Sequence, residues 1–194
     1  MRILVVAAAV VGTAALSLGA ETITVYVQND ARLAASELCR AQSLAAAIFA
    51  SAQVGVDWRK GAPKPWLLQE QRPIAVRIIS DVATSAHPGA LAFAQAYEGV
   101  HITILYERTR LCVPGRPEVI LAYVLVHEIT HMLEGISRHS RTGIMKANWN
   151  WADHYAMLRG NFLLSAEDVG LIHAGLAWRA SGKLMAGYRP PAIN

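Results

Sequence analysis

Beyond its first twenty residues, the chain opens on a strand-like pattern and continues with a helical one. Apolar positions alternate with polar or half-polar ones over residues 21–30, and this period of two predicts a strand. Residues 31–54 are rich in Ala and Leu, have helical periodicity and contain neither Gly nor Pro, so they predict a long helix. Asn29 or Asp30 would serve as its N-cap.

Short strands separated by turn signals follow this helix. Residues 54–66 predict a strand and then a loop rich in Gly and Pro, and residues 73–81 form an apolar, β-branched run that predicts another strand. Segment 85–109 is punctuated by glycines and predicts two further short strands, and residues 110–119 predict a turn.

A second long helix is predicted over residues 117–134, which are apolar nearly all round. A helix that is apolar on every side is buried between layers, and Gly135 is a good terminator for it. Residues 150–160 predict a turn or short helix, and residues 164–178 predict a helix with Ser165 at its N-cap. This order of strands and helices indicates an α/β fold built on a sheet.

The composition agrees with one folded domain. The 194 residues are 54% hydrophobic and 16% charged. This balance excludes a disordered chain and is sufficient for one hydrophobic core. The sequence contains no internal repeat, low-complexity tract or clear domain linker.

The first twenty residues, MRILVVAAAVVGTAALSLGA, have the layout of a secretory signal peptide: an arginine, an apolar run and small residues at the end. The alternative is a transmembrane anchor, because the run approaches the lower end of spanning length. We favour cleavage after Gly19 or Ala20, since small residues interrupt the run and no basic cluster follows it. Residues 21–194 would then be a secreted domain, extracellular or periplasmic, without stable membrane insertion.

Charge and cysteine content add two expectations for this exported domain. Removal of Arg2 with the signal peptide lowers the net charge from +4 to +3, and no run of Lys or Arg remains. This mild surplus gives little reason to expect nucleic acid as a partner, and we expect a monomer. Cys39 and Cys112 would form one disulfide, with two free buried thiols as the alternative.

Chemistry concentrates in residues 127–145, HEITHMLEGISRHSRTGIM. Inside a helix, His127 and His131 stand one turn apart on the same face, so both imidazoles can bind one metal ion. Glu128 lies on the flank of that face, where it can act on a water molecule at the metal without being a ligand. Burying these polar side chains in an apolar helix is costly, and a zinc ion would offset that cost.

A catalytic zinc needs a third protein ligand. The candidates are His139, Glu134, Asp153 and His154. We favour His139, because it follows a glycine turn, is close in the sequence and offers an imidazole, which suits zinc.

The stretch HEITHMLEGISRHS, followed closely by GIM, resembles the metzincins, a clan of zinc metallopeptidases. Their motif is H-E-x-x-H-x-x-G-x-x-H with a methionine turn below the metal, whereas the spacing here is H-E-x-x-H-x-x-x-G-x-x-x-H. The serine after the last histidine and the short run to Met145 look most like the matrixin branch. LSAEDVGLIHAGL is also similar to the last helix of that branch.

The resemblance implies a fold with two parts. Residues 21–135 would form a mixed, mostly parallel twisted sheet with an antiparallel edge strand, a long backing helix and an active-site helix. Residues 136–194 would form a small, mostly helical C-terminal subdomain.

The resemblance also implies roles for individual residues. His127, His131 and His139 would bind zinc, and Glu128 would be the general base. Substrate would add as an extended chain to the edge strand within residues 89–97. The residues expected to contact it are Ala90, Leu91, Ala92 and Phe93. Met145 would either form a hydrophobic floor under the metal or simply fill the core. Trp149 and Trp151 would either wall the pocket or pack between the lower helices.

The sequence therefore predicts a secreted zinc endopeptidase that hydrolyses peptide or protein substrates. One rival is a secreted zinc-binding module on a peptidase scaffold without hydrolytic activity, and the intact Glu128 argues against it. Another is a structural zinc closed by four protein ligands, for instance with Asp153 or His154 as the fourth.

Overall fold

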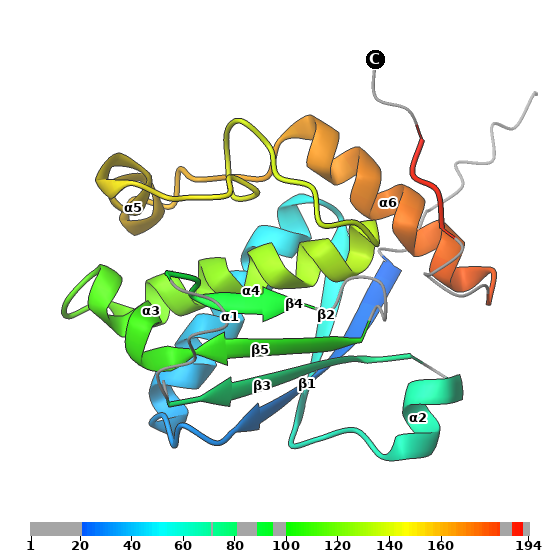
Figure 1. Ribbon diagram of the computed structural model, residues 1–194, viewed down its shortest axis with the longest axis horizontal. Helices are drawn as coiled ribbons and strands as arrows, with labels where there is room; N and C mark the ends of the chain where they lie inside the picture. Colours follow the sequence, from blue (N-terminus) through cyan, green and yellow to red (C-terminus); the bar gives the residue numbers. More distant parts are fainter. Residues whose placement is uncertain (1–20, 71, 81–88, 95–99, 183–187, 192–194) are drawn as a thin grey trace, which may run out of the picture.

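Figure 1 shows a computed structural model of the chain, which describes residues 21–70, 72–80, 89–94, 100–182 and 188–191. The predicted signal peptide, residues 1–20, lies outside the described residues, as do positions 95–97 of the proposed edge strand. In the described part of the chain, none of the helices has the length and apolarity needed to cross a membrane.

A five-stranded sheet in the order β2-β1-β3-β5-β4 forms one layer of the molecule. Its strands are β1 (Glu21–Asn29), β2 (Val54–Lys60), β3 (Ile74–Ile79), β4 (Ala92–Ala94) and β5 (His101–Leu105). Neighbouring strands run parallel, except that β4 at the edge is antiparallel to β5. This confirms the predicted mixed, mostly parallel sheet with an antiparallel edge strand.

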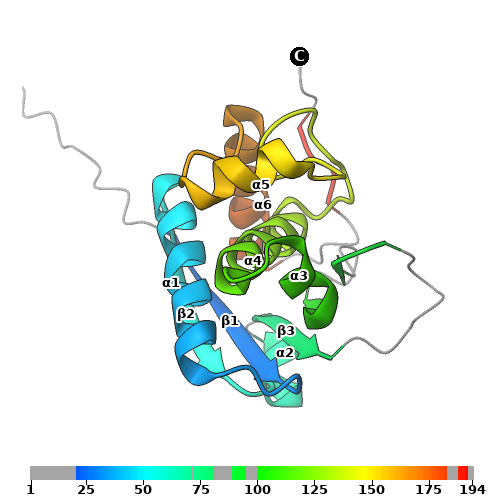
Figure 2. The same ribbon diagram turned by 90° about the vertical axis from the view of Figure 1, so that its left-hand side faces the viewer.

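The helices lie mainly on one side of this sheet. They are α1 (Ala35–Ser51), α2 (Pro65–Glu70), α3 (Tyr106–Cys112), α4 (Pro117–Glu134), α5 (Trp151–Leu158) and α6 (Ala166–Ala180). α1 and α4 pack against each other next to the sheet, and α5 and α6 lie on the opposite side of α4 (Figures 1 and 2). The long backing helix, the central helix and the helical C-terminal part are therefore as predicted.

The position of α4 explains its sequence. Every residue from Val119 to Glu134 is buried, because the helix is covered by the sheet and by α1, α3 and α6. The helix ends at Gly135, which adopts the left-handed region with a φ of 66° and donates its N–H to the carbonyl of His131 at 2.9 Å. Glycine adopts this backbone conformation without steric cost, which lets the chain turn back after the helix.

α6 crosses α4 in very close contact at Gly175. A Cβ atom at this position would lie 1.8 Å from the carbonyl oxygen of Leu133, a distance at which a side chain cannot fit. Glycine therefore sets how closely α6 approaches the end of α4.

Three local predictions are wrong. α1 begins later than expected, with Ala34 at its N-cap, because the Asn29 side chain bonds the backbone N–H and carbonyl of Leu33 at 3.0 Å each. α2 replaces part of a predicted loop and begins at Pro65, a residue suited to a first helical turn. α3 replaces the end of the segment predicted as strands and the start of the predicted turn. Inside it, the buried Thr109 hydroxyl donates to the carbonyl of Leu105 at 3.0 Å.

Candidate metal centre

Three imidazoles converge beside α4. His127 and His131 project from this helix one turn apart, and His139 comes from the loop that follows Gly135. One ring nitrogen from each of the three lies within 4.8 Å of the other two. His139 is thus the candidate that the fold brings to the first two histidines. The other three candidates, Glu134, Asp153 and His154, are not part of this group.

Backbone carbonyls orient the two helical imidazoles. Nδ1 of His127 lies 2.8 Å from the carbonyl oxygen of Ile144, and Nδ1 of His131 lies 3.1 Å from that of Ile136. Since a carbonyl only accepts, both Nδ1 atoms carry the proton and donate it. Each Nε2 atom is then left with an unprotonated lone pair, which is the form that binds a metal.

The two Nε2 atoms of His127 and His131 face each other at 3.1 Å. Two lone pairs at this distance repel, and a cation bound by both nitrogens removes the repulsion. The third imidazole completes the set, with its ring centroid 5.4 Å from that of His127 and 5.0 Å from that of His131. Three neutral imidazoles are a donor set typical of zinc, so these residues fit a metal ion.

The protonation of the histidines favours metal binding as well. Burial lowers the pKa of His127 to about 4 and the pKa of His131 to about 3. The pKa of His139 is also lowered, by partial burial and by the charge of Arg138. All three rings are therefore neutral at physiological pH, and protons compete only weakly for their nitrogens.

Glu128 lies beside this centre and is only 8% exposed. Burial raises the pKa of its carboxyl group to about 8 in the metal-free protein. A positive charge held by the histidines would favour the ionised form again, because an opposite charge nearby stabilises a carboxylate. Glu128 is therefore a carboxyl group whose proton affinity is close to that needed for proton transfer at neutral pH.

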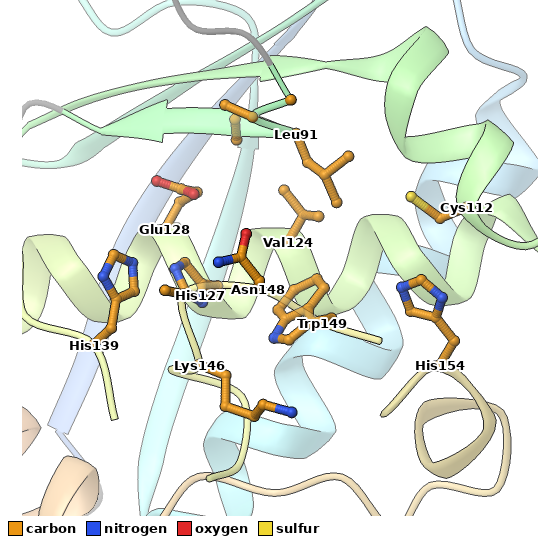
Figure 3. A pocket seen from close by; sticks show the side chains of 14 residues that line it. Leu91, Cys112, Val124, His127, Glu128, His139, Lys146, Asn148, Trp149 and His154 are labelled. Atoms are coloured by element: carbon orange, nitrogen blue, oxygen red, sulfur yellow. The ribbon is translucent and has the colours of Figure 1, made fainter. Parts of the chain in front are cut away.

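A pocket of about 540 Å³ opens next to the histidines and Glu128. Figure 3 shows His127 and His139 at one end of it and Cys112 and His154 at the other. Ala90, Leu91 and Ala92, which were expected to contact substrate, line it from the edge-strand side. Phe93 does not line the pocket. It directly follows Ala92 in β4, and successive side chains of a strand point to opposite faces of the sheet.

Met145 does not line the pocket, so it is not placed to contact substrate, and its expected role as a hydrophobic floor under the metal stays a prediction. Its side chain is fully buried, at 0% exposure, within the turn that follows the third histidine. Its carbonyl oxygen accepts the backbone N–H of Ser140 at 2.7 Å. This turn supports the centre through the backbone, since the neighbouring Ile144 carbonyl orients His127.

Sequence patterns did not predict which residues line the part of the pocket away from His127 and His139. The tryptophans were expected either to wall the pocket or to pack between helices. Trp149 lines the pocket, and its indole N–H donates to the Ile144 carbonyl at 3.0 Å. Trp151 is 79% exposed and lies away from it. The lining residues that the sequence did not assign to this pocket are Cys112, Val124, Lys146, Ala147, Asn148 and His154.

Both cysteines are free, contrary to the expected disulfide. Cys39 is exposed on α1, whereas the thiol of Cys112 is half-buried, lines the pocket and donates to the carbonyl of Arg108 at 3.4 Å. The two thiols thus lie on different helices and in different surroundings.

Comparison with known proteins supports the architecture. The structure resembles that of an archaemetzincin from Methanopyrus kandleri, with a TM-score of 0.53, 13% sequence identity, and coverage of 84% of this chain and 99% of that chain. The fold is archaemetzincin-like. A second archaemetzincin, from Archaeoglobus fulgidus and complexed with malonate, gives a TM-score of 0.45 at 14% identity over 76% of this chain and 90% of its own.

The sequence comparisons add no closer relative. No protein-family model and no curated protein matches the chain. The Methanopyrus kandleri structure is an archaemetzincin, so the matrixin-like branch expected from the motif is not confirmed. At these identities the likeness concerns the fold, and the chemistry has to be argued from the residues of the site.

Proposed function

We propose that this protein is a secreted zinc-dependent endopeptidase. The observation that carries the proposal is the joint position of three imidazole nitrogens within 4.8 Å of one another and of Glu128 on the wall of the same pocket. A hydrolytic zinc site needs three neutral nitrogen donors, a nearby carboxyl group and space for a ligand.

Each group in the pocket would have a separate task. His127, His131 and His139 would hold the metal, and zinc, when bound, would polarise a peptide carbonyl and lower the pKa of a water molecule. Glu128 would accept the proton of the attacking water and deliver it to the leaving amine, as general base and then general acid. Edge strand β4 would align an extended peptide through its backbone, since it pairs with β5 on one side only among the described strands.

The number of candidate ligands supports a catalytic rather than a structural zinc. Structural zinc sites have four protein ligands, and catalytic sites have three with one position open. Within the described residues, the group contains three histidines and no fourth ligand. Asp153 is engaged elsewhere, in an ion pair with Lys146 and a capping box with Asn150.

The test is hydrolysis of a peptide library by the purified protein, with and without a chelator, together with its zinc content. Replacing the carboxyl group in Glu128→Gln should lower the rate at least about 100-fold while zinc remains bound. Glu107→Gln, on α3 and paired with Arg110, is the matched control and should keep full activity. Full activity of Glu128→Gln, or hydrolysis unaffected by the chelator, would contradict the mechanism. Bound zinc without any hydrolysis would favour the zinc-binding module instead.

Secretion is the part of the proposal that rests on residues 1–20 alone. Expression of the full chain should release a shortened protein outside the cytoplasm, with Glu21 or Ala20 as its first residue. Mass determination of the exported protein checks this. A membrane-bound protein that keeps residues 1–20 would instead support the alternative, a transmembrane anchor.

A further inference from the structure

The third imidazole stands on a loop rather than on a helix. His139 is the exposed member of the three, whereas His127 and His131 are buried on α4. The stretch from Gly135 to His139 is also one residue longer than in the metzincin motif. A side chain on such a loop adopts many positions unless the loop is fixed, and each additional position weakens metal binding.

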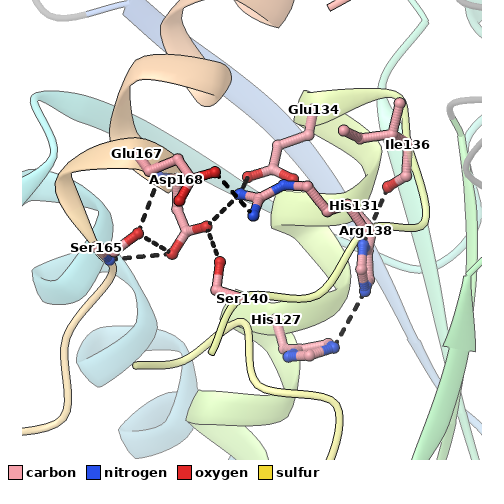
Figure 4. Close-up of polar contacts among 9 residues, drawn as sticks. All are labelled: His127, His131, Glu134, Ile136, Arg138, Ser140, Ser165, Glu167 and Asp168. Carbon is pink, nitrogen blue, oxygen red and sulfur yellow. Dashed lines mark hydrogen bonds and ion pairs between the residues drawn. The ribbon is translucent and has the colours of Figure 1, made fainter. Parts of the chain in front are cut away.

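Arg138, the residue before His139, fixes this loop to two helices. Its Nη2 atom lies 2.8 Å from Oδ1 of Asp168, and its Nη1 atom lies 3.2 Å from Oε1 of Glu167, both in the first turn of α6. Nη2 is also 4.0 Å from Oε1 of Glu134, the last residue of α4. Figure 4 shows the guanidinium between these three carboxylates.

The residue on the other side of His139 is attached to the same carboxylate. The Ser140 hydroxyl donates to Oδ1 of Asp168 at 2.5 Å. Asp168 in turn is held by the capping box of α6, where its Oδ2 atom accepts the Ser165 hydroxyl at 2.6 Å and the Ser165 N–H at 3.0 Å. Both neighbours of His139 are thus anchored on one fully buried acid.

The charges explain why an arginine is needed at this position. Asp168 and Glu134 are both 0% exposed, and a buried carboxylate without a counter-charge is strongly destabilising. Neither oxygen of Glu134 has a hydrogen-bond partner among the described residues. Burial raises the pKa of this carboxyl group to about 8, and the nearby charge of Arg138 acts against that rise. The planar, multidonor guanidinium can face three carboxylates at once, which a lysine ammonium does less well.

We infer that Arg138 is a positioning residue for the third metal ligand: its ion pairs with Asp168, Glu167 and Glu134 hold the loop so that His139 faces His127 and His131 before a metal binds. The inference rests on the proposed function only in that the centre binds zinc. It concerns a side chain that is not itself a ligand and does not touch the reacting atoms.

The experiment measures zinc affinity by competition with a chelator in Arg138→Met, Arg138→Lys and the control Arg141→Met. Arg141 is an exposed arginine on the other side of His139, so its variant tests loss of a positive charge near the centre alone. Arg138→Met should weaken zinc binding about 10- to 100-fold, the range found when groups that orient a ligand are lost. Arg138→Lys should recover part of this loss, and Arg141→Met should stay within about threefold of the unchanged protein.

Cobalt substitution provides a readout that a general loss of stability does not change. In the folded Arg138→Met protein, the visible absorption of bound Co²⁺ should decrease and resemble that of His139→Ala, because the third nitrogen no longer binds. Normal cobalt spectra and zinc affinity in Arg138→Met would overturn the inference. If Arg138→Met does not fold, Arg138→Lys provides the test. A zinc affinity of Arg138→Lys equal to that of Arg141→Met would then overturn the positioning role of Arg138.

The outcomes separate this inference from the proposed function. If the unchanged protein binds neither zinc nor cobalt, the proposed function fails. If it binds both and the Arg138 variants bind equally well, only the positioning role fails.

Discussion

The Nε2 atoms of His127 and His131 lie 3.1 Å apart, and each ring is fixed through its Nδ1 atom by a backbone carbonyl. Neither ring can turn away without losing that hydrogen bond in a buried position. The pair is therefore held in a geometry that is unfavourable without a cation and favourable with one.

This geometry predicts that zinc stabilises the folded protein. Added at about 1,000 times its dissociation constant, zinc should raise the free energy of unfolding by about 4 kcal/mol, because it binds the folded state only. His131→Ala should abolish this gain. The control is His173→Ala, whose ring on α6 bonds the carbonyl of Ala52 at 2.9 Å, outside the centre. Calorimetry with and without zinc measures the effect, and an unchanged gain in His131→Ala would refute the assignment.

The lowered pKa values of the histidines predict at which pH the metal is released. A pKa of about 4 for His127 and about 3 for His131 means that both rings stay neutral well below the usual histidine pKa of about 6.5. As the pH falls, protons therefore begin to displace the metal only near pH 4 to 5. Cobalt absorption followed during acid titration tests this, and half-release near pH 6.5 would contradict it.

Trp149 and His127 donate to the same acceptor, the carbonyl oxygen of Ile144, at 3.0 Å and 2.8 Å. Trp149→Phe keeps the aromatic ring and removes the indole N–H. We expect a loss of about 1 kcal/mol in the free energy of unfolding, the typical contribution of one hydrogen bond. We also expect weaker zinc binding, because the carbonyl that orients His127 is less well fixed. Trp151→Phe, at a 79% exposed position, should change neither quantity.

The close contact at Gly175 predicts that a single methyl group added there strongly lowers the stability of the fold. In Gly175→Ala, the new Cβ atom would meet the Leu133 carbonyl oxygen, so α6 must move away from α4. We expect a loss of about 2 kcal/mol or more, together with weaker zinc binding, because Asp168 moves with the helix. Gly170→Ala on the same helix has open space around its Cβ atom and should stabilise by about 0.5–1 kcal/mol. Denaturant unfolding of both variants decides between these outcomes.

Sequence patterns correctly predicted those helices whose signals lie within a short stretch of the chain. The bounds of α4 agree with the prediction, because its apolar residues extend over all sides and Gly135 ends it. The Ser165 cap of α6 is confirmed, since a capping box is complete within four consecutive residues. α2 and α3 were missed because each is short and lies in a segment with turn residues. The α1 cap was misplaced because Asn29 is used by a turn before the helix.

Sequence alone predicted that His127 and His131 share one face of α4 with Glu128 on its flank, because neighbouring turns of a helix are positioned by helix geometry. It narrowed the third ligand to four residues, with His139 preferred. The fold selects His139 among these four, and packing between distant segments brings Trp149, Lys146 and the Arg138–Asp168 pair around the centre. These contacts join a loop, a turn and α6 to α4, and the Arg138–Asp168 pair among them depends on how closely α6 packs at Gly175. Packing between distant segments is set by the shape of the whole core, which no local pattern encodes.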